Sequence, residues 1–508
     1  MTDTLRSRLL AAEREHAARP ALWIEDRRWT YAELFADARV LAAQFDAEVA
    51  PGLPIGIHCQ RDHISILGIL AAALSVRPYL PLNPNFPPER LAAIIGIGRP
   101  GALLCSDETR GAVEAMLPDL PSGLRLFGLN GVVALGTGPI PGPVEDPTVA
   151  GAETTAYMMF TSGTTGTPKG VRVLERNLLA YLDGIAPIAA IGPDDRATHF
   201  FDLSFDLSVH DIFVTLTAGA ELCVLPKTLS MAVAEFARSR RLTHWFSVPS
   251  LATFCDRLGQ LTPAALPYLR TALFCGEALA VSVMRRFREA APQTRIWNIY
   301  GPTEATIAFT AYEVKEPDGL DGMAVVPIGL PIGREKIRLV ALDDPEQPGA
   351  AELCLGGLQV APGYMNNPEQ NASRFMERDG LRWYRTGDVV RLSDEHGVLF
   401  LGRVDDQVKI SGYRVELLEI DAALRLAAET PEVAALPWPV SPSGQADQVV
   451  GFVVNSTVSQ AEIRKRCRAQ LPAYMVPRKI VVLDRLPLTV SGKIDRKALR
   501  GILEANKG

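Results

Sequence analysis

The chain has 508 residues, 47% of them hydrophobic and 22% charged, which suits about two or three globular units with cores of their own. Its net charge of -6 gives no general attraction to nucleic acids or anionic membranes, and we find no basic patch with interleaved aromatic residues. Seven scattered cysteines, none in a CxxC pair, suggest neither a disulfide framework nor a zinc site.

The N-terminal half alternates short aliphatic strands with helical periodicity. Its first residues mix acidic and basic side chains without an apolar stretch, so we expect no ordinary secretory signal. PIGIHCQ predicts a strand, and the apolar run Ile64–Val76 predicts a buried helix, because about 13 residues are too few to cross a bilayer. ALLCSD predicts another strand before an amphipathic helix. The alternation indicates α/β units with parallel sheets, and we expect a cytoplasmic protein without membrane insertion.

The segment Gly128–Pro147 is rich in glycine and proline and predicts a surface connection between two such units. It is followed by YMMFTSGTTGTPKGV at Tyr157–Val171, where an apolar strand leads into a loop of hydroxyl and glycine residues with one lysine. Backbone N–H groups, hydroxyls and an ammonium in such a loop can bind phosphates. The loop differs from that of P-loop NTPases, because Pro168 precedes Lys169 and no serine or threonine follows it. A flexible linker is the alternative, but linkers seldom follow a buried strand.

A second boundary is predicted near Gly402–Asp406, where the strand VLFLGR gives way to VDDQVKISGYRVE. Roughly the last hundred residues carry helices and strands of their own, LLEIDAALRLAAET, VVGFVV, QAEIRKRCRAQL and KIVVLD. They predict a small α+β domain. The expected domains are therefore a core at residues 1–403 and a C-terminal domain at residues 404–508.

Ten further motifs occur in one order along nearly the whole chain. They are WTYAEL at Trp29, YLPLNPNFPPERL at Tyr79, FDLSVHDIF at Phe205, LFCGEAL at Leu273, NIYGPTEATIA at Asn298, GGLQVAPGY at Gly356, YRTGD at Tyr384, GRVDDQVKISGYRVE at Gly402, LPAYMVP at Leu471 and SGKIDRKAL at Ser491. Together with the phosphate loop they resemble the adenylate-forming superfamily, which includes acyl-CoA synthetases, luciferases and peptide-synthetase adenylation domains.

The resemblance implies an α/β fold, with a large N-terminal core of stacked α/β subdomains with mixed sheets and a small mobile α+β C-terminal domain. It also implies an AMP-forming ligase that uses ATP and Mg²⁺ to join a carboxylate to AMP, releasing pyrophosphate, before the acyl group passes to a thiol. Such an enzyme must hold two anions together, so it needs cations directed at the pentavalent phosphate.

The resemblance gives each motif a role. Lys493 would reach the substrate carboxylate and the α-phosphate, unless it is a solvated surface lysine, and Glu304 would bind Mg²⁺, with Thr161 also in the catalytic set. The nucleotide-binding residues that it implies are Ser162, Gly163, Thr164, Thr165, Lys169, Gly276, Glu277, Asn298, Tyr300, Gly301, Thr303, Asp388 and Arg403.

Three of these residues have plain alternatives. Asp388 follows a tight Thr-Gly turn and could accept both ribose hydroxyls, or it could only cap that turn. Arg403 would assist at the ribose or phosphate, or it forms a surface ion pair. Tyr300 would stack on the adenine, or it is a core tyrosine without ligand contact.

Asp206 in FDLSVHDIF indicates the substrate class. In amino-acid-activating members of the superfamily, the aspartate at this place pairs with the substrate α-ammonium, and relatives that activate fatty or aryl acids lack it. Burying an ammonium group without a counter-charge costs several kcal/mol, on the order of a buried unpaired ion. A pocket that offers an aspartate therefore selects substrates with an amino group. Asp202 or Asp211 could be the true partner instead, and helix capping is another possible role for Asp206.

The resemblance also places residues around the substrate side chain. These are Leu207, His210, Ser247, Leu273, Cys275, Ile299, Ile307 and Ala308, a set that does not suggest a charged or large aromatic substrate. The sequences of the motifs around Asp206, Cys275 and Ile299 are most similar to those of stand-alone D-alanine:carrier protein ligases. In those ligases a cysteine at the position of Cys275 contacts the methyl group of the alanine. Those ligases tend to carry methionine at His210 and threonine at Ile299. A methyl group changes selectivity by about 1 to 3 kcal/mol, so glycine, either alanine, serine and proline stay open. For His210, a hydrogen-bonded core histidine is an equal alternative.

In this superfamily the small domain rotates between adenylation and thiol transfer. Asp405 is the expected hinge residue, with a simple strand-turn aspartate as the alternative. After rotation the loop at Ser411, Gly412 and Tyr413 would face the phosphopantetheine thiol. No LGGxS-type attachment motif occurs in the sequence, so we expect a separate carrier protein as partner.

Two other functions compete with an amino acid:carrier protein ligase. The first is an acyl-CoA or aryl-CoA ligase, against which Asp206 argues. The second is a nucleotide-binding regulatory protein without turnover, against which the retention of Lys493, Glu304 and Asp388 argues.

Overall fold

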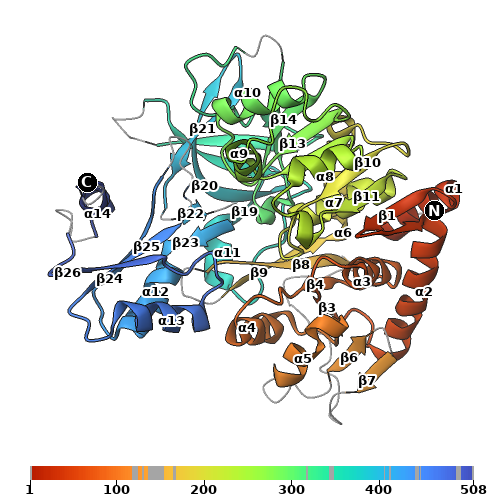
Figure 1. Ribbon diagram of the computed structural model, residues 1–508, viewed down its shortest axis with the longest axis horizontal. Coiled ribbons are helices and arrows are strands. Elements are labelled where there is room, and N and C mark those ends of the chain that lie inside the picture. The colour runs from red at the N-terminus through yellow and green to blue at the C-terminus, as the bar shows by residue number, and fades with distance from the viewer. Residues whose placement is uncertain are drawn as a thin grey trace. The chain divides into compact units, whose positions relative to one another are not determined.

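The structure of the protein is a computed structural model. It describes residues 3–116, 124–128, 131–134, 154–163, 168–315, 319–342, 348–405, 407–410, 413–440, 446, 448–487 and 494–505. The chain forms two compact units (Figure 1). Unit 1 comprises Met1–Pro84, Ile94–Met159 and Gly170–Gly402, and unit 2 comprises Asn85–Ala93, Phe160–Lys169 and Arg403–Gly508. Unit 2 therefore adds two short N-terminal segments to the C-terminal one, and the domain boundary at residues 403–404 stays a prediction.

The first sheet of unit 1 has the strand order β16-β15-β14-β13-β12-β10-β11-β1-β2. The six strands in the middle of this order, β14-β13-β12-β10-β11-β1, are parallel to one another. At the edges, β2 pairs antiparallel with β1, and β15 pairs antiparallel with β14 and β16. The strands are β1 (Pro20–Ile24), β2 (Arg27–Thr30), β10 (Arg196–His199), β11 (Glu221–Val224), β12 (His244–Ser247), β13 (Thr271–Phe274), β14 (Arg295–Tyr300), β15 (Thr310–Val314) and β16 (Leu330–Pro331).

The second sheet has the order β7-β6-β5-β3-β4-β8-β9, and its interior pairs are parallel as the sequence predicts. The segment Gly128–Pro147 is not only a connection, because its β-branched residues form β7, which pairs antiparallel with β6. The strands are β3 (Ile55–His58), β4 (Tyr79–Pro81), β5 (Ala102–Cys105), β6 (Arg125–Gly128), β7 (Gly131–Ala134), β8 (Thr155–Thr161) and β9 (Lys169–Leu174).

A third sheet has the order β17-β18-β20-β19, with β21 paired to β20. Along that order each neighbouring pair is antiparallel, so the described core combines sheets of both kinds, as expected for the mixed α/β class. The strands are β17 (Lys336–Ala341), β18 (Ala351–Gly356), β19 (Phe375–Arg378), β20 (Leu381–Ser393) and β21 (Gly397–Arg403).

Side-chain caps explain where several helices begin. Thr30 and Glu33 form a capping box at the start of α2, and Asp62 and Ser65 form one at α3. The predicted buried helix is α3, and among the described residues no helix combines the length and apolar character that a membrane crossing needs. The helices of this part of the chain are α1 (Leu5–His16), α2 (Tyr31–Glu48), α3 (His63–Leu74), α4 (Pro88–Gly98), α5 (Asp107–Met116), α6 (Glu175–Ala189), α7 (Leu207–Thr217), α8 (Val233–Ser239), α9 (Pro249–Arg257), α10 (Val281–Ala290) and α11 (Pro368–Arg374), with single turns η2 (Lys227–Leu229) and η3 (Thr303–Ala305).

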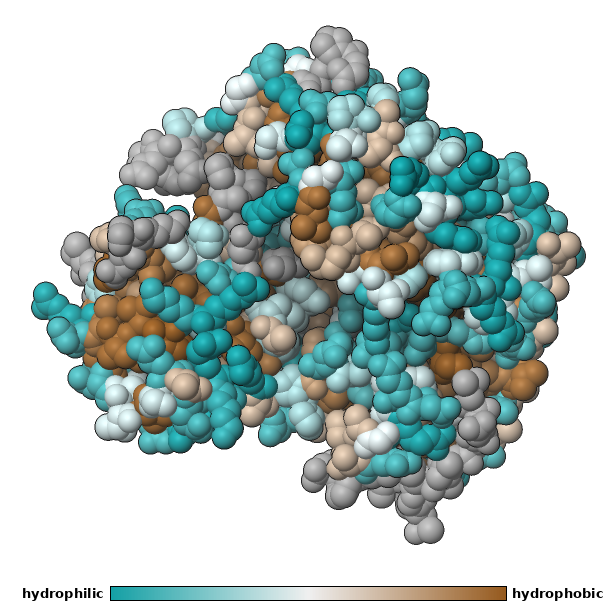
Figure 2. Space-filling model, viewed as in Figure 1, coloured by the Kyte–Doolittle hydropathy of each residue, from teal (hydrophilic) through white to brown (hydrophobic). Residues whose placement is uncertain are grey.

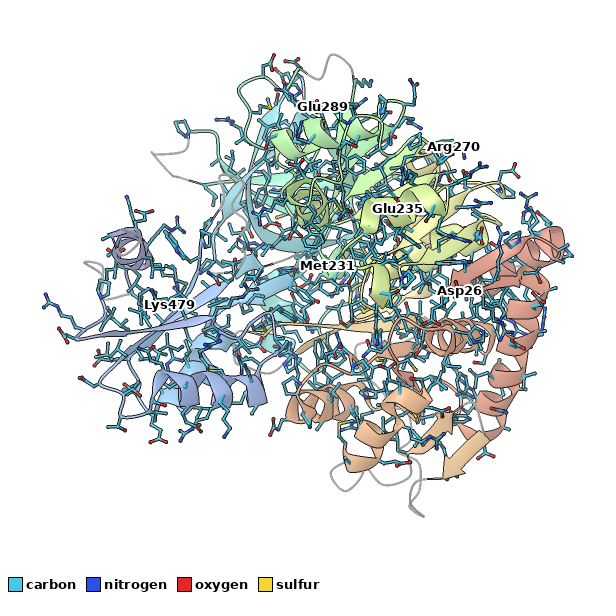
Figure 3. The ribbon with its side chains drawn as sticks, viewed as in Figure 1. Asp26, Met231, Glu235, Arg270, Glu289 and Lys479 are labelled. Atoms are coloured by element: carbon cyan, nitrogen blue, oxygen red, sulfur yellow. The ribbon has the colours of Figure 1, made fainter. Side chains whose placement is uncertain are left out.

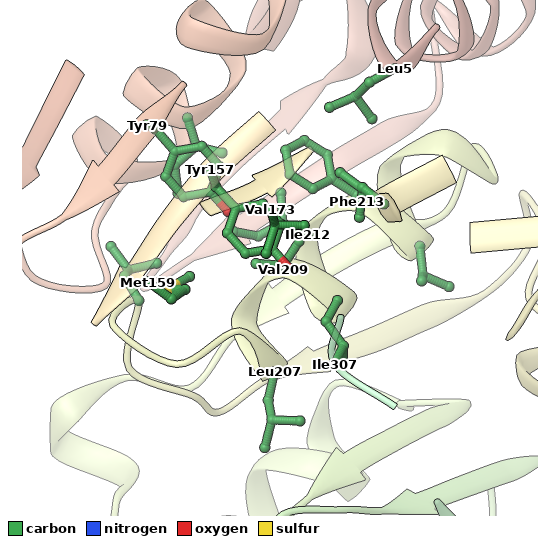
Figure 4. Close-up of a cluster of buried hydrophobic side chains, with 14 of the residues drawn as sticks. Leu5, Tyr79, Tyr157, Met159, Val173, Leu207, Val209, Ile212, Phe213 and Ile307 are labelled. Atoms are coloured by element: carbon green, nitrogen blue, oxygen red, sulfur yellow. The ribbon is translucent and has the colours of Figure 1, made fainter. Parts of the chain in front are cut away.

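One large hydrophobic cluster joins the sheets of unit 1. It includes Tyr79, Tyr157, Val209 and Phe213, and α7 packs within it against β10 and β11 (Figure 4). Leu207 and Ile307, which the sequence assigns to a substrate pocket, belong to the same cluster. The two residues are therefore surrounded by buried hydrophobic side chains, and close packing limits how far they can shift.

Unit 2 contains the small α+β arrangement that the sequence predicts. Its strands form a hairpin of β22 and β23 and a sheet of order β24-β25-β26. Its own hydrophobic clusters include Ile420 and Val453 in one and Phe452 and Leu499 in another. The elements are β22 (Gln407–Ile410), β23 (Tyr413–Glu416), α12 (Leu417–Ala428), β24 (Val433–Pro437), β25 (Val449–Val454), α13 (Gln460–Gln470), β26 (Lys479–Leu483) and α14 (Arg496–Ala505).

Charged side chains are exposed on several elements of the described chain. Exposed charged side chains include Asp26, Glu235, Arg270, Glu289 and Lys479 (Figure 3). Hydrophobic side chains gather over β24, β25 and β26 (Figure 2), where Val482 is 53% exposed.

Candidate functional site

Asp206 lies directly before α7, and its side chain does not cap that helix. The Thr303 hydroxyl and the Ile307 N–H donate hydrogen bonds to its buried carboxylate. Its Oδ2 atom has no hydrogen-bond partner among the described residues. Burial raises the pKa of Asp206 to about 6, and the nearby Glu304 charge acts in the same direction. A buried polar atom without a partner is costly, and a ligand that donates to Oδ2 would remove that cost.

The two competing aspartates are fully engaged by the protein. The Asp202 carboxylate accepts hydrogen bonds from the Ser204 N–H at 2.9 Å, the Ser204 hydroxyl at 2.6 Å and the Asn83 amide at 2.9 Å. Asp211 is buried and pairs with His199 Nδ1 at 3.0 Å. Of the three aspartates that the sequence singles out, Asp206 is the one with an oxygen left for a ligand.

Most residues predicted to line the substrate side chain lie in the large hydrophobic cluster of unit 1 described above. They are Leu207, Leu273, Cys275, Ile299, Ile307 and Ala308, each at most 5% exposed. Ser247 is also buried, and its hydroxyl accepts a hydrogen bond from Trp245 Nε1 at 2.7 Å and donates one to the Val248 carbonyl at 3.0 Å. The set offers apolar side chains and a hydroxyl that already has its hydrogen-bond partners, which suits a small uncharged substrate side chain.

His210 lies four residues after Asp206, one turn along α7 on the same face of the helix. Its Nδ1 shares a hydrogen bond of 2.5 Å with the hydroxyl of Tyr181, and its ring packs on Phe246 with 4.2 Å between ring centroids. Burial lowers the pKa of His210 to about 3, so the ring is neutral at physiological pH. His210 and Leu273 line a cavity of about 20 Å³, which has room for about one water molecule.

The segment after β14 has an unusual backbone. Thr306 and Ile307 have φ angles of +56° and +70°, a left-handed conformation that costs a β-branched residue about 1 to 2 kcal/mol. The segment returns so close to Gly301 that a Cβ there would lie 2.6 Å from the Cα of Ala308. Gly301 is therefore explained by close packing.

Glu304 is buried in the same segment, at 1% exposure. The Tyr364 hydroxyl donates a hydrogen bond of 2.6 Å to its Oε1, and the hydroxyls of Tyr364 and Tyr384 lie 3.2 Å apart. Neither tyrosine was expected at the site from the sequence, although each lies in a motif quoted above.

The residues expected around the nucleoside are also bonded within unit 1. The Tyr300 hydroxyl donates to Asp388 Oδ2, and the stacking of Tyr300 on the adenine stays a prediction. The Asn298 amide donates to the carbonyls of Val326 at 3.1 Å and Pro327 at 2.8 Å. Gly276 has a φ of +85°, where side chains are disfavoured, and Glu277 Oε2 accepts the Ser250 N–H at 2.8 Å.

The phosphate loop belongs to unit 2, where carboxylates contact its donors. Lys169 Nζ lies 3.1 Å from Glu416 Oε1, and the Gly163 N–H donates to Glu419 Oε2 at 3.1 Å. The Ser162 hydroxyl donates to the Arg414 carbonyl at 2.9 Å and accepts the Glu416 N–H at 3.1 Å. Thr161 ends β8. Thr164, Thr165 and Lys493 lie outside the described residues, as do Ser411 and Gly412.

Arg403 and Asp405 form a two-pronged ion pair within unit 2. Arg403 Nε lies 2.6 Å from Asp405 Oδ1, and Arg403 Nη2 lies 2.9 Å from Oδ2. An ion pair is the alternative that the sequence leaves open for Arg403. Its ligand role and the hinge role of Asp405 stay predictions.

Comparison with known families and proteins gives one consistent result. The family described as AMP-binding enzyme matches residues 10–365, and the family described as AMP-binding enzyme C-terminal domain matches residues 419–493. D-alanine--D-alanyl carrier protein ligase of Bacillus licheniformis is 30% identical over 494 residues, covering 94% of this chain and 95% of the relative. The structure of Vibrio cholerae adenylation domain AlmE in complex with glycyl-adenosine-5'-phosphate is 31% identical with a TM-score of 0.89, covering 99% of this chain and 98% of that chain.

Other relatives are much longer than this chain. Tyrocidine synthase 3 of Brevibacillus parabrevis is 31% identical over 490 residues, which are 94% of this chain and 7% of that protein. The chain likewise spans 13% of tyrocidine synthase 2 of the same organism, at 33% identity over 502 residues. The similarity therefore concerns one part of these large synthetases.

Proposed function

We propose that this chain, which belongs to the family of AMP-binding enzymes, is an AMP-forming ligase that activates a small amino acid, glycine or alanine, as the aminoacyl adenylate. The adenylate would then react with the phosphopantetheine thiol of a separate carrier protein. The proposal is carried by Asp206, whose buried carboxylate keeps one oxygen without a partner among the described residues.

An α-ammonium group suits that oxygen. It would donate a charge-assisted hydrogen bond to Oδ2, while Thr303 and Ile307 keep their bonds to the same carboxylate. A plain carboxylic acid has no group that pairs with Asp206 and would leave its charge buried and uncompensated, so the pocket discriminates against fatty and aryl acids.

The size of the substrate side chain is inferred from the surroundings of His210. The ring is held in place by Tyr181 and Phe246, so it cannot easily turn aside to admit a longer side chain. This supports a hydrogen or a methyl group as the substrate side chain. Glycine and alanine also occur in the names of two similar proteins. One is a structure in complex with glycyl-adenosine-5'-phosphate, and the other is a D-alanine--D-alanyl carrier protein ligase.

Adenylation forms a bond between the amino-acid carboxylate and the α-phosphorus and breaks the bond to pyrophosphate. In our proposal Lys493 offsets the negative charge that builds up at the phosphorus. The hydroxyl of Ser162, the N–H of Gly163 and the ammonium of Lys169 bind phosphate oxygens, and Asp388 binds the ribose. The phosphate-loop donors must then exchange their carboxylate partners, Glu416 and Glu419, for phosphate oxygens.

Glu304 is the residue that would hold Mg²⁺, since a carboxylate oxygen is a hard donor. Among the described residues there is no group of three or more His, Cys, Asp or Glu side chains that could hold a metal ion. One protein carboxylate together with phosphate oxygens and water is a usual arrangement for this cation. When bound, Mg²⁺ would offset phosphate charge during the transfer.

The proposed carrier protein rests on similarity. The ligase from Bacillus licheniformis is named for its carrier protein and is matched over 95% of its length. A solved fusion of an adenylation and a carrier domain is similar over 94% of this chain at 23% identity, which bears on the fold alone.

The function is tested by exchange of labelled pyrophosphate into ATP, with Mg²⁺ and each L- and D-amino acid in turn. We expect exchange with glycine or alanine, and a Lys493→Ala variant that still binds ATP should lose it. Turnover of a plain carboxylic acid with coenzyme A would instead establish an acyl-CoA ligase. Absence of exchange with every amino acid would refute the proposal.

A further inference from the structure

The segment Thr303–Ala308 has a backbone that its own residues do not favour. Thr306 and Ile307 both have left-handed φ angles, and both are β-branched. Such residues clash with their own backbone in this conformation, so neighbouring contacts must hold them there. The question is which side chain supplies those contacts.

Gln359 supplies them from the motif GGLQVAPGY, about fifty residues further along the chain. Its side chain is fully buried, and its Nε2 lies 2.8 Å from the carbonyl oxygen of Ala308 and 3.3 Å from those of Ala305 and Thr306. Three acceptors around one atom identify it as the amide nitrogen, because an oxygen there would be repelled. Its two hydrogens therefore serve three carbonyls.

The contact is reciprocal. The Thr306 hydroxyl donates a hydrogen bond of 2.6 Å to the Gln359 carbonyl, and the Ala361 N–H donates one of 2.9 Å to the Glu304 carbonyl. Glu335 Oε2 in turn accepts the Gln359 N–H at 3.4 Å. Gln359 is thus fixed on its own side and joined to the strained segment at several points.

The strained segment is also what completes the surroundings of Asp206. The Ile307 N–H and the Thr303 hydroxyl donate to the Asp206 carboxylate. If Thr306 and Ile307 relaxed to ordinary negative φ angles, the Ile307 N–H would turn away from Asp206, because rotation about φ and ψ redirects the peptide plane.

We propose that Gln359 is a positioning residue for amino-acid binding, which acts by holding residues 305–308 in the conformation that directs the Ile307 N–H to Asp206. The inference rests on the proposed function, since it assumes that Asp206 binds the substrate ammonium. Gln359 itself touches neither substrate nor nucleotide in this scheme.

Two substitutions test the proposal. Gln359→Met keeps the length and approximate volume of the side chain and removes its donors, and Gln359→Glu keeps the shape and replaces the donor by an acceptor. We expect Gln359→Met to raise the amino-acid KM in pyrophosphate exchange about tenfold or more, with the ATP KM changed by less than about threefold. Gln359→Glu should have the larger effect, and if it does not fold, the methionine variant alone decides.

Leu358→Ala is the matched control, because Leu358 precedes Gln359 and is 55% exposed. It should leave both KM values unchanged. A merely structural role for Gln359 would lower the melting temperature or kcat without separating the two KM values, and that result would overturn the proposal. Wild-type protein without amino-acid-dependent exchange would refute the proposed function, whereas an active wild type with an unaltered Gln359→Met variant would refute only this inference.

Discussion

Asp206 illustrates a conflict between function and stability at a single residue. Burial raises the pKa of its carboxylate to about 6, from an ordinary value of 3.8. A raised pKa means that the folded state resists ionisation, so the charged carboxylate opposes folding by about 3 kcal/mol at neutral pH. In the proposed function, the same unsatisfied charge would make the pocket selective for an ammonium group.

We predict that Asp206→Asn is more resistant to urea than the wild type and is nevertheless impaired. The gain in free energy of unfolding should be full above pH 6 and should vanish as the pH falls below about 4, where both states bind the proton. The amino-acid KM should rise about hundredfold while the ATP KM changes little. Urea unfolding at several pH values and pyrophosphate exchange measure the two effects.

Asp202→Asn is the matched control, because Asp202 already has three hydrogen-bond partners. It should lose stability and leave the amino-acid KM within about threefold of the wild type. A large KM effect of Asp202→Asn and none of Asp206→Asn would move the ammonium site to Asp202.

At the scale of elements, the proposed function makes the size of the substrate pocket depend on α6 and α7 together. Tyr181 of α6 shares the hydrogen bond that fixes His210 of α7. We predict that His210→Ala raises kcat/KM for longer amino acids relative to glycine about tenfold or more, because it removes an imidazole from the proposed substrate pocket. Tyr181→Phe, which frees the ring without removing it, should show a smaller change in the same direction. Unchanged preference in both variants would leave His210 as a core histidine.

The hairpin of β22 and β23 supplies a carboxylate that is paired with the lysine of the phosphate loop. Glu416, at the end of β23, is paired with Lys169, and both side chains are less than 10% exposed. Because phosphate oxygens would compete with this carboxylate for Lys169, we predict that Glu416→Gln lowers the ATP KM about threefold or more. The amino-acid KM should not change. Glu462→Gln, in the first turn of α13, is the control. An ATP KM that rises in Glu416→Gln would show that the pair supports binding.

Sequence patterns predicted the elements better than the contacts between them. The strands β3, β5 and β25 and the helices α3, α12 and α13 lie where periodicity places them, because the pattern of buried side chains is local. Asp206 and Glu304 could be singled out because each lies in a compact motif. Gln359 and Tyr181 could not, since their importance comes from partners that are distant in the sequence and a buried amide or phenol has no signature of its own.

For the whole molecule, the sequence predicts a single division of the chain near residue 403. The compact units of the structure instead combine segments that are distant in the sequence. Arg90 and Glu419 form a buried ion pair within unit 2 although they are 329 residues apart. No local pattern predicts such a pair, because each residue taken alone resembles an ordinary surface charge. Unit 2 therefore includes Asn85–Ala93 and Phe160–Lys169.

The predicted rotation of the C-terminal domain is testable at Asp405. Proline fixes φ near about -65°, so Asp405→Pro should prevent a change of backbone conformation at this position. We expect this variant to retain pyrophosphate exchange and to lose loading of a carrier protein. Asp405→Ala also breaks the ion pair with Arg403 but leaves φ free, and it should retain both activities. Carrier loading by Asp405→Pro at the wild-type rate would place the hinge elsewhere.

The Oδ2 atom of Asp206 also offers a way to identify the substrate by binding alone, without an assay of the reaction. A zwitterion that fills the gap associates with the native fold alone, and mass action then raises the temperature at which the fold is lost. Scanning fluorimetry of the nucleotide-free protein against a panel of amino acids, with their deaminated counterparts as blanks, would rank candidates before any carrier is known.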